Sequence, residues 1–512
     1  MRTVLLLLAF HALAVADDTE LLVRKILAST DAADRARLVE TLVAGNPDPR
    51  DVAKRFAAGR EYASDVPTGR LERTIVGPDG KERDYLLFVP EGYVPGKRYP
   101  LLFDLHGGVS RTPAPDHEAL AEGDGVGAYV EREGFLLAIP AGEKGAEWWT
   151  DVGMGNVLGV LAETSRLYNV DENRVFATGF SDGGSGSFYL ALAAPTLFAG
   201  VVPLNGHIGV AQAGGLQVHL GNLVNVPVYA VNTTEDQLYP SASLRPAIDA
   251  MKELGVPITW HEIKGYGHDP SYVPEEMPAI AAWLKERRRD PHPKTLLWEG
   301  AAPGRVRWLA VTEIGERKGD EFPDVNPKLP PGRVRIGINI DQAFEGPGVL
   351  VAEVQDGYPG KAMGLEQGDI LVAFDGTDIG DITVLLALLK AKSFGDTFKL
   401  KIQRGAEILE KEGKFPDAHA EEVFRRGRPF GTIRALAGNN EVDVRANGVK
   451  AFELYLGEPL FDLNKPVVVR VNGKTMHEGV VAPDLRFLVG QAAADKDRTM
   501  VYLGRIRLTV GP

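Results

Sequence analysis

Between residues 99 and 263, short apolar runs rich in β-forming residues alternate with helical stretches, and this alternation constrains the fold more than any other feature. Strands separated by helices favour parallel pairing, and strands that are apolar throughout are typical of sheets buried on both faces. Two strands at 71–76 and 83–90, joined by a turn, come before them. We therefore predict a largely parallel sheet covered by helices, an α/β domain over residues 70–290. The alternating runs lie at residues 99–105, 135–139, 174–178, 200–204, 226–231 and 258–263.

The chain has 512 residues, more than one hydrophobic core normally supports, so several domains are expected. Residues 17–69 show helical spacing of apolar residues, and we expect this N-terminal helical segment to pack on the later part of the chain. Residues 314–332 are charged and rich in proline, which indicates a linker. A further small unit is predicted at residues 333–414. From residue 430 to 512 the pattern is almost entirely that of strands, which predicts a C-terminal β-sandwich.

Residues 294–313 hold two more expected strands, at 294–298 and 305–312, which precede the linker and have no sheet of their own. Two strands alone are marginally stable in water, so they need partners. We predict that they pair with the C-terminal strands, which makes the unit at 333–414 an insertion within one sandwich. The alternative is that they extend the α/β domain.

The first sixteen residues have the three parts of a secretory signal peptide: Arg2, an apolar run from Val4 to Leu13, and Ala14-Val15-Ala16 before Asp17. We expect cleavage after Ala16 and a secreted or periplasmic protein. The apolar run is shorter than the roughly 18 residues or more that indicate a membrane span. We expect no membrane span elsewhere in the sequence.

The composition excludes several kinds of site. Cysteine is absent, so the chain cannot form disulfides or thiolate metal sites. The formal net charge is −13, which would repel the phosphate backbone of a nucleic acid. We therefore expect no metal, no cofactor and no nucleic-acid partner.

One serine stands between glycines in the stretch Gly179-Phe-Ser-Asp-Gly183, directly after the strand expected at 174–178 and before a helix expected at 185–194. In the pattern G-x-S-x-G, the serine occupies a strained turn between a strand and a helix, where larger flanking side chains would collide. The order of strand, turn and helix predicts that Ser181 is a nucleophile. The alternative is a glycine-rich loop without chemistry.

A serine hydroxyl needs a base to remove its proton, and the base needs a third group to hold its tautomer. His268 and Asp236 each follow an expected strand, and the chain order Ser181, Asp236, His268 is known for such triads. We predict these three residues as the catalytic set. Glu235 and Asp269 are alternatives for the acid, and a solvated loop position is the alternative for His268.

An oxyanion needs preorganised donors, usually backbone N–H groups that approach the reacting carbonyl closely. The strand at 99–105 runs into His106-Gly107-Gly108, a turn that allows this approach. We assign the oxyanion hole to the N–H of Asp182 together with the N–H of Gly107 or Gly108. His106 itself is interpreted as a structural hydrogen-bonding residue.

Two more loops are expected on the same side of the sheet, carrying Trp148-Trp149 and Asn205-Gly206-His207. Open α/β sheets bind their ligands at that side. The tryptophans form either an acyl or aromatic pocket or part of the core. We assign a catalytic role to none of these residues.

Four motifs together carry a resemblance to a known family: HGG at 106–108, RVFATGFSDGG at 174–184, EDQLYP at 235–240 and GYGHD at 265–269. Residues 70–289 resemble the bacterial α/β-hydrolases grouped with polyhydroxybutyrate depolymerases, feruloyl and acetylxylan esterases, and the catalytic domain of prolyl oligopeptidases. The resemblance implies an α/β-hydrolase fold and the same triad of Ser181, Asp236 and His268. The propeller that precedes the catalytic domain in prolyl oligopeptidases has no counterpart before Arg70.

Residues 333–414 resemble a bacterial PDZ domain of the kind attached to exported proteases, through the stretch GLEQGDILVAFDG at 364–376. The resemblance implies that a peptide C-terminus adds as a strand beside Ile336, Gly337, Ile338 and Ile340. The alternative is a degenerate module that only packs between domains.

These patterns predict an exported serine hydrolase that acts through an acyl-enzyme on a carboxylic ester. A serine peptidase of the prolyl oligopeptidase-like class, with the PDZ domain binding peptide C-termini, is the second hypothesis. A binding or scaffolding protein without catalysis is the third. The expected fold class is α/β, with an α/β-hydrolase domain, a PDZ domain and a C-terminal β-sandwich. The expected partners are a small ester or peptide substrate and, at the PDZ domain, a protein or peptide C-terminus.

Overall fold

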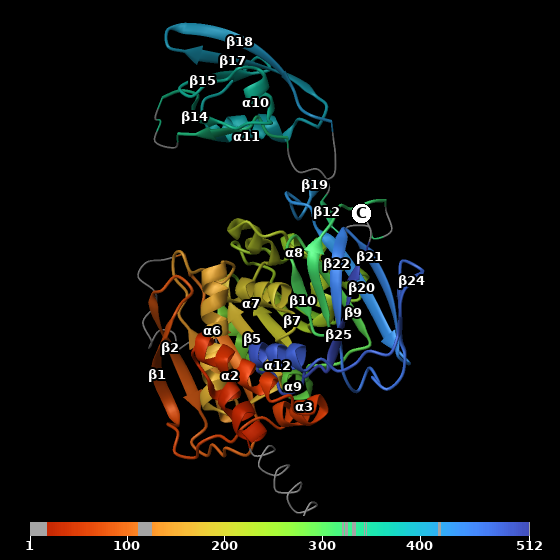
Figure 1. Ribbon diagram of the computed structural model, residues 1–512. Helices are drawn as coiled ribbons and strands as arrows, with labels where there is room; N and C mark the ends of the chain where they lie inside the picture. The colour runs from red at the N-terminus through yellow and green to blue at the C-terminus, as the bar shows by residue number, and fades with distance from the viewer. Residues whose placement is uncertain are drawn as a thin grey trace, which may run out of the picture. The chain divides into compact units, whose positions relative to one another are not determined.

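The computed structural model describes residues 18–110, 125–319, 322, 326–329, 334–341, 344, 346–417 and 421–510 (Figure 1). The chain divides into two compact units. One combines the residues up to Asn326 with those from Phe424 onward, and the other is the inserted segment Pro327–Val423. The segment expected as a signal peptide lies outside the described residues.

The α/β domain is built on an eight-stranded sheet with the order β1-β2-β4-β3-β5-β6-β7-β8. β2 runs antiparallel to β1 and β4, and the other pairs are parallel. All residues of β3, β4, β6 and β7 are buried, as expected of strands covered by helices. The strands are β1 Gly69–Val76, β2 Glu82–Val89, β3 Tyr99–Leu105, β4 Leu136–Pro140, β5 Val170–Phe180, β6 Gly200–Leu204, β7 Val228–Thr233 and β8 Ile258–Ile263.

Helices connect these strands, and the loops after the parallel strands leave the sheet at one edge. That edge receives the segments after β3, β5, β7 and β8, which carry the residues predicted for catalysis. The helices are α5 Val126–Arg132, α6 Asp151–Leu167, α7 Asp182–Ala193, α8 Ser241–Glu253 and α9 Val273–Glu286, with the short 3₁₀ turns η1 Ile208–Gly214, η2 Leu220–Asn225 and η3 Pro270–Tyr272.

A β-sandwich forms from strands on both sides of the inserted segment. Its sheets have the orders β24-β23-β21-β20-β9 and β10-β11-β22-β25, and their buried residues share one core. β9 pairs with β20, and β11 pairs with β22, so strands before the insertion complete sheets made after it. The elements are β9 Thr295–Gly300, β10 Gly304–Val306, β11 Leu309–Ile314, β20 Gly431–Gly438, β21 Glu441–Asn447, β22 Val449–Leu456, β23 Val467–Val471, β24 Lys474–Gly479, β25 Gly504–Thr509 and the helix α12 Leu485–Asp495.

Two sequence boundaries differ from the structure. The strand expected at 305–312 is two strands, because Arg307 has a φ of 48° and turns the chain between β10 and β11. The linker expected at 314–332 ends earlier, since the inserted unit begins at Pro327 and β12 Lys328–Leu329 pairs with β19 Glu421–Glu422.

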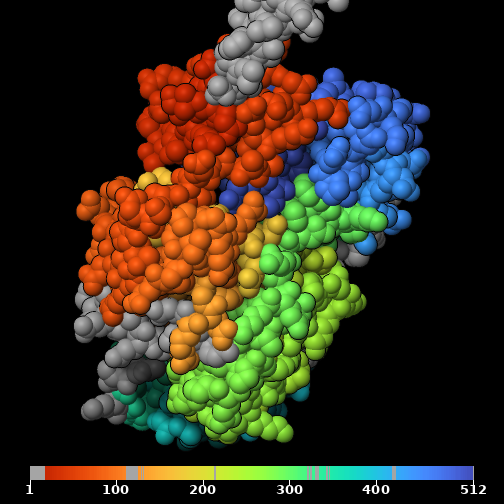
Figure 2. All heavy atoms as spheres, turned by 90° about the horizontal axis from the view of Figure 1, so that it is seen from below, coloured from red at the N-terminus to blue at the C-terminus, as the bar shows by residue number. Residues whose placement is uncertain are grey.

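The N-terminal helices pack on the far end of the chain. They comprise residues 18–28, α2 Ala32–Ala44 and α3 Pro49–Ala58. Their buried side chains, among them Val23 and Phe56, belong to the core of the β-sandwich, and α2 and α3 lie against α12. Figure 2 shows this N-terminal segment, in red, beside the blue C-terminal residues. The first helices therefore complete the core of the last domain in the chain.

Buried ion pairs connect the α/β domain to the β-sandwich. The Arg289 guanidinium donates to Asp497 at 2.7 Å and to the Asn173 side chain at 2.8 Å. Arg498 pairs with Glu172 and donates to the Asn169 side chain at 2.8 Å. Burial would raise the pKa of Asp497, but Arg289 and Thr499 lower it below its ordinary value. The two domains are thus joined by ion pairs whose charged groups are largely buried.

Replacing Asp497 with alanine is expected to destabilise this unit by about 3–5 kcal/mol, because it leaves the buried Arg289 without its counter-ion. Urea denaturation would measure the change in free energy of unfolding. Glu286→Ala, at the exposed end of α9, is the control and should change it by less than about 0.5 kcal/mol. Because the folded pKa of Asp497 is lowered, the difference should persist at neutral pH and disappear only as acid protonates this carboxylate. An equal free energy of unfolding for Asp497→Ala and the parent at neutral pH would contradict the stabilising role of the Arg289–Asp497 pair.

The inserted unit has a six-stranded sheet that contains β13-β14-β15-β17-β18 in this order. β13 lies at its edge, with Ile338 and Ile340 partly buried against the core. Ile336 is buried and precedes this strand, and its carbonyl accepts the N–H of Gly360 at 2.7 Å. The strand open to a peptide is therefore shorter than predicted. The elements are β13 Ile338–Ile340, β14 Val349–Val354, α10 Pro359–Ala362, β15 Ile370–Phe374, β16 Thr377–Asp378, α11 Ile382–Lys390, β17 Thr397–Arg404 and β18 Glu407–Lys414.

Candidate active site

Ser181 occupies the turn between a strand and a helix. β5 ends at Phe180 and α7 begins at Asp182, and Ser181 has a φ of 62°, in the left-handed region that side chains rarely adopt. A Cβ at Gly179 would lie 2.2 Å from the Leu105 carbonyl oxygen, and one at Gly183 would lie 1.6 Å from it. Only glycine fits at these two positions, so the pattern seen in the sequence reflects the close contact between this turn and β3.

His268 lies between the serine and an aspartate. Its Nε2 is 2.7 Å from the Ser181 Oγ, and its Nδ1 is 2.8 Å from the Asp236 Oδ2. An ionised carboxylate only accepts hydrogen bonds, so Nδ1 carries a proton and Nε2 is left to accept the serine proton. The loops after β5, β7 and β8 thus bring the three predicted residues into one hydrogen-bonded series.

Asp236 is buried, and each of its oxygens accepts two hydrogen bonds. Oδ1 accepts the N–H groups of Leu238 and Tyr239, both at 2.8 Å, and Oδ2 accepts His268 and the Asn205 amide, both at 2.8 Å. Burial raises the pKa of Asp236, but these hydrogen bonds outweigh it and lower the pKa below its ordinary value. The carboxylate is therefore held ionised and in a fixed orientation.

The two alternative acids lie elsewhere. Asp269 caps the η3 turn by accepting the N–H of Ser271 at 2.8 Å. Glu235 is exposed, and its backbone N–H donates to the Tyr266 carbonyl at 3.1 Å. Of the acidic residues that the sequence left open, only Asp236 contacts His268.

Two of the residues predicted to supply oxyanion donors, Gly107 and Asp182, lie near the serine. A Cβ placed on Gly107 would lie 3.1 Å from the Ser181 Cβ, so the backbone at this glycine passes close to the nucleophile. Gly108 has a φ of 69° and turns the chain away. The N–H of Asp182 is the first of α7, where backbone donors have no partner within a helix. The backbone at Gly107 and the first residue of α7 are therefore both close to Ser181.

His106 has a structural place, as interpreted from the sequence. Its Nε2 accepts the N–H of Gly142 at 2.8 Å, and its Nδ1 donates to the Gly107 carbonyl at 2.8 Å. Burial lowers the pKa of His106, which keeps the ring neutral in these two roles. Trp148 is fully buried and donates its indole N–H to the His106 carbonyl at 2.9 Å. Trp148 is therefore part of the core beneath the HGG turn.

Asn205 and Tyr239 were not among the residues predicted for the site. Asn205 follows β6 with a φ of 44°, and it donates to Thr233 at 2.7 Å and to Asp236, while it accepts the Tyr272 hydroxyl at 2.7 Å. Its position within a loop at the catalytic edge was the available signal. The Tyr239 hydroxyl donates to the Asp182 Oδ1 at 2.8 Å, and its position in the EDQLYP motif was a signal.

The side chain of Asp182 ties two loops to the nucleophile turn. Its Oδ2 accepts the N–H of Val109 at 3.1 Å, from the segment that comes after the HGG turn. Its Oδ1 accepts Tyr239, whose ring also packs edge-on against His268 with centroids 5.7 Å apart. Asp182 therefore fixes the loop after β3 and the loop after β7 relative to Ser181.

Tyr239→Phe is expected to lower kcat by about tenfold while KM changes by less than about twofold, since it removes one hydrogen bond to the charged Asp182 without opening a cavity. Steady-state kinetics on an activated ester would measure both constants. Tyr266→Phe is the matched control, because among the described residues that hydroxyl donates only to the exposed Glu275, at 3.3 Å. An unchanged kcat in Tyr239→Phe would contradict the positioning role.

The described part of the chain contains no candidate metal site and no candidate membrane span. Among the described residues, no group of three or more His, Cys, Asp or Glu side chains is arranged to hold a metal ion. No helix within the same ranges is both long enough and apolar enough to cross a membrane.

Two family models match the chain. Residues 155–287 match the model described as Phospholipase/Carboxylesterase, and residues 334–412 match that of the PDZ domain. The chain combines an α/β-hydrolase domain with a PDZ domain. The resemblance and the fold class predicted from the sequence are thereby confirmed.

The α/β-hydrolase domain is also similar to curated esterases. It is 30% identical over 183 residues to a probable feruloyl esterase C of Aspergillus terreus, a match that covers 35% of this chain and 64% of the relative. It is 27% identical over 169 residues to a bifunctional acetylxylan esterase/xylanase of Neocallimastix patriciarum, covering 31% of this chain and 22% of that protein. The chain thus spans less than two thirds of the length of these relatives. Among solved structures, a thermostable esterase is 26% identical, with a TM-score of 0.37, over 43% of this chain and 63% of that one.

Proposed function

We propose that this protein is an exported serine hydrolase that cleaves carboxylic esters through an acyl-enzyme intermediate. The observation that carries the proposal is the continuous hydrogen-bonded series from Asp236 through His268 to Ser181, at the edge of the sheet where such domains bind their substrates. The similarity of the α/β-hydrolase domain to curated esterases favours an ester as the substrate. Export is supported by the sequence pattern of residues 1–16.

The geometry supports acylation of the serine and then its hydrolysis. The Ser181 Oγ attacks the ester carbonyl carbon while His268 Nε2 takes the hydroxyl proton, and Asp236 stays ionised and stabilises the imidazolium. The N–H groups of Asp182 and of Gly107 or Gly108 donate to the oxygen that becomes negative. His268 then gives its proton to the leaving alcohol, and the acyl group remains on Ser181. A water molecule then attacks the acyl carbonyl carbon while His268 takes its proton. His268 returns this proton to the Ser181 Oγ, and the carboxylic acid is released.

A peptidase function is the second candidate, and the PDZ domain is the observation that favours it. β13 lies at the edge of its sheet, where a peptide can add as a further strand. The terminal carboxylate of such a peptide would lie next to the turn before β13, where Gly337 has a φ of 82°. A C-terminus bound there would be held on the same chain as Ser181.

A substrate panel separates these functions. Hydrolysis of short-chain nitrophenyl esters, feruloyl esters and aminoacyl-peptide amides would be measured with the mature chain and, in parallel, with its Ser181→Ala variant. We expect turnover of esters, with amides cleaved at least about a thousandfold more slowly. Preferred cleavage of peptide amides would replace the esterase proposal with the peptidase one. Activity that survives in Ser181→Ala would overturn both, and no turnover of any substrate would favour a binding or scaffolding role.

A further inference from the structure

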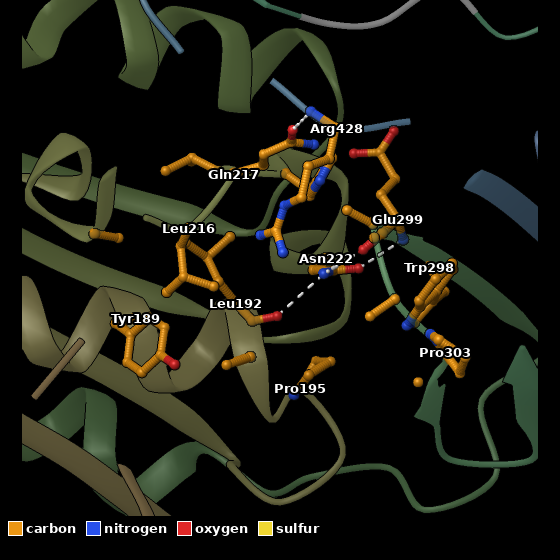
Figure 3. A pocket seen from close by; sticks show the side chains of 18 of the residues that line it. Tyr189, Leu192, Pro195, Leu216, Gln217, Asn222, Trp298, Glu299, Pro303 and Arg428 are labelled. Atoms are coloured by element: carbon orange, nitrogen blue, oxygen red, sulfur yellow. Dashed lines mark hydrogen bonds between the residues drawn. The ribbon is translucent and has the colours of Figure 1, made fainter. Parts of the chain in front are cut away.

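A second pocket lies at the opposite end of α7 from Ser181, and the proposed reaction does not use it (Figure 3). Its volume is about 210 Å³, and it is lined by the end of α7, the segment around η1 and η2, the connection between β9 and β10, and Arg428. Leu192, in this lining, lies eleven residues beyond Ser181, which is about 16 Å along the helix axis. A molecule in this pocket would not contact the nucleophile.

Most of the wall is apolar, and several of its polar groups are already occupied. Leu192, Leu216, Trp298 and Pro303 provide apolar surface. The Asn222 amide donates to the carbonyls of Leu192 and Glu299 at 3.0 and 2.9 Å. The Glu299 carboxylate accepts the N–H of Gly221 at 3.0 Å, and Arg305 is paired with Asp495. These groups are therefore engaged within the protein and are poor recognition elements for a ligand.

Arg428 and Gln217 in the wall keep hydrogen-bond donors that a ligand can use. The Arg428 guanidinium reaches into the pocket between Leu216 and Asn222 (Figure 3), donates to the Gly215 carbonyl at 3.3 Å, and makes no ion pair with any described residue. The Gln217 Nε2 is buried and has no partner among the described residues, while its Oε1 accepts the N–H of Arg428. A cation and a buried amide donor thus stand together beside an apolar wall, and a buried donor without an acceptor is costly.

We propose that this pocket binds a small carboxylate with an apolar body. The carboxylate would accept hydrogen bonds from Arg428 and Gln217, and the apolar part would lie against Leu192, Leu216 and Trp298. The volume is below the roughly 300–1,000 Å³ of sites for drug-sized ligands, so the ligand is a small monocarboxylic acid. The site joins both domains of the larger unit, because α7 belongs to the α/β-hydrolase domain and Trp298 to the β-sandwich.

Titration calorimetry with benzoate, on the full mature chain at low salt, tests the proposal. We expect saturable binding with a Kd of about 1 mM, a weak affinity suited to a ligand of few atoms. Benzamide, which has the same shape without the charge, should bind at least about tenfold more weakly. Absence of saturable benzoate binding, or equal binding of benzamide, would overturn the proposal.

Paired variants locate the binding. Arg428→Gln should weaken benzoate at least about tenfold, whereas Arg425→Gln, at an exposed arginine outside the pocket lining, should leave it unchanged. Leu216→Trp, at a partly exposed side chain, narrows the pocket and should abolish binding in a folded chain. Benzoate affinity unchanged in both Arg428→Gln and Leu216→Trp would place the ligand elsewhere and overturn the assignment. Ester hydrolysis, measured separately, should persist in both variants, so failure here leaves the proposed function to its own test.

Discussion

Ser181→Ala is expected to lower kcat by about 10⁵- to 10⁶-fold, because it removes the atom that forms the acyl-enzyme and leaves only the oxyanion donors and substrate binding. His268→Ala should cost a similar factor, since the serine hydroxyl cannot attack while it keeps its proton. The double variant should be about as slow as either single one, because the two residues act as one unit.

Single-turnover kinetics on a nitrophenyl ester measures this loss without depending on product release. Ser187→Ala is the matched control. Its hydroxyl lies on the same helix, is fully buried, and donates to the Gly183 carbonyl at 3.0 Å. Retained activity in Ser187→Ala beside a complete loss in Ser181→Ala assigns the effect to the nucleophile. If kcat of the double variant fell by the product of the two single-variant factors, this would contradict a proton transfer shared by His268 and Ser181.

Asp236→Asn is expected to lower kcat by about 10³- to 10⁴-fold through the orientation of its amide. The N–H groups of Leu238 and Tyr239 both point at Oδ1, so the amide oxygen of an asparagine must take that side. Its NH₂ group then faces His268 Nδ1 and the Asn205 amide, both of which donate to Asp236 Oδ2 in the parent protein. The imidazole is driven to the tautomer with its proton on Nε2, which cannot accept the proton of Ser181.

Kinetics over a range of pH distinguishes this cause from a folding defect. A wrong tautomer leaves the thermal unfolding midpoint near that of the parent and lowers kcat at every pH at which the parent is active. Glu235→Gln, next to Asp236 but exposed, is the control and should keep kcat within about twofold. Equal loss in both variants would mean that the loop as a whole, and not the carboxylate on His268, supports catalysis.

The three residues of the hydrogen-bonded series could be picked out from the sequence because each is signalled locally. The glycines around Ser181 are needed by the contact of one turn with β3, and Asp236 and His268 follow strands that an apolar run reveals. The pairing of the early strands with the last domain was accessible for a similar reason, since two isolated strands need partners. The inserted unit was recognised from a contiguous motif.

The remaining features depend on residues that are distant in the sequence. The sequence places Asn205 in a loop at the catalytic edge, but it does not indicate that the amide will meet Asp236, thirty-one positions later. Nothing near Val23 indicates a place in the core of the last domain. The division of one expected strand at Arg307 depends on a single backbone angle. Such outcomes are decided by tertiary contacts, which leave no periodic pattern in the chain.

The packing of the first helices on the last domain has a kinetic consequence. Val23 and Phe56 share a core with Ile506 of β25, so contacts in this core span nearly the whole chain. Proteins whose contacts join residues far apart in the sequence fold slowly. Their chains lose loop-closure entropy before the burial of apolar side chains stabilises the contact. During synthesis the sandwich core stays incomplete until β25 emerges, while the α/β sheet can form earlier. The apolar faces of the first helices are then without their partner for almost the entire time that the chain is being made, which is when aggregation competes with folding.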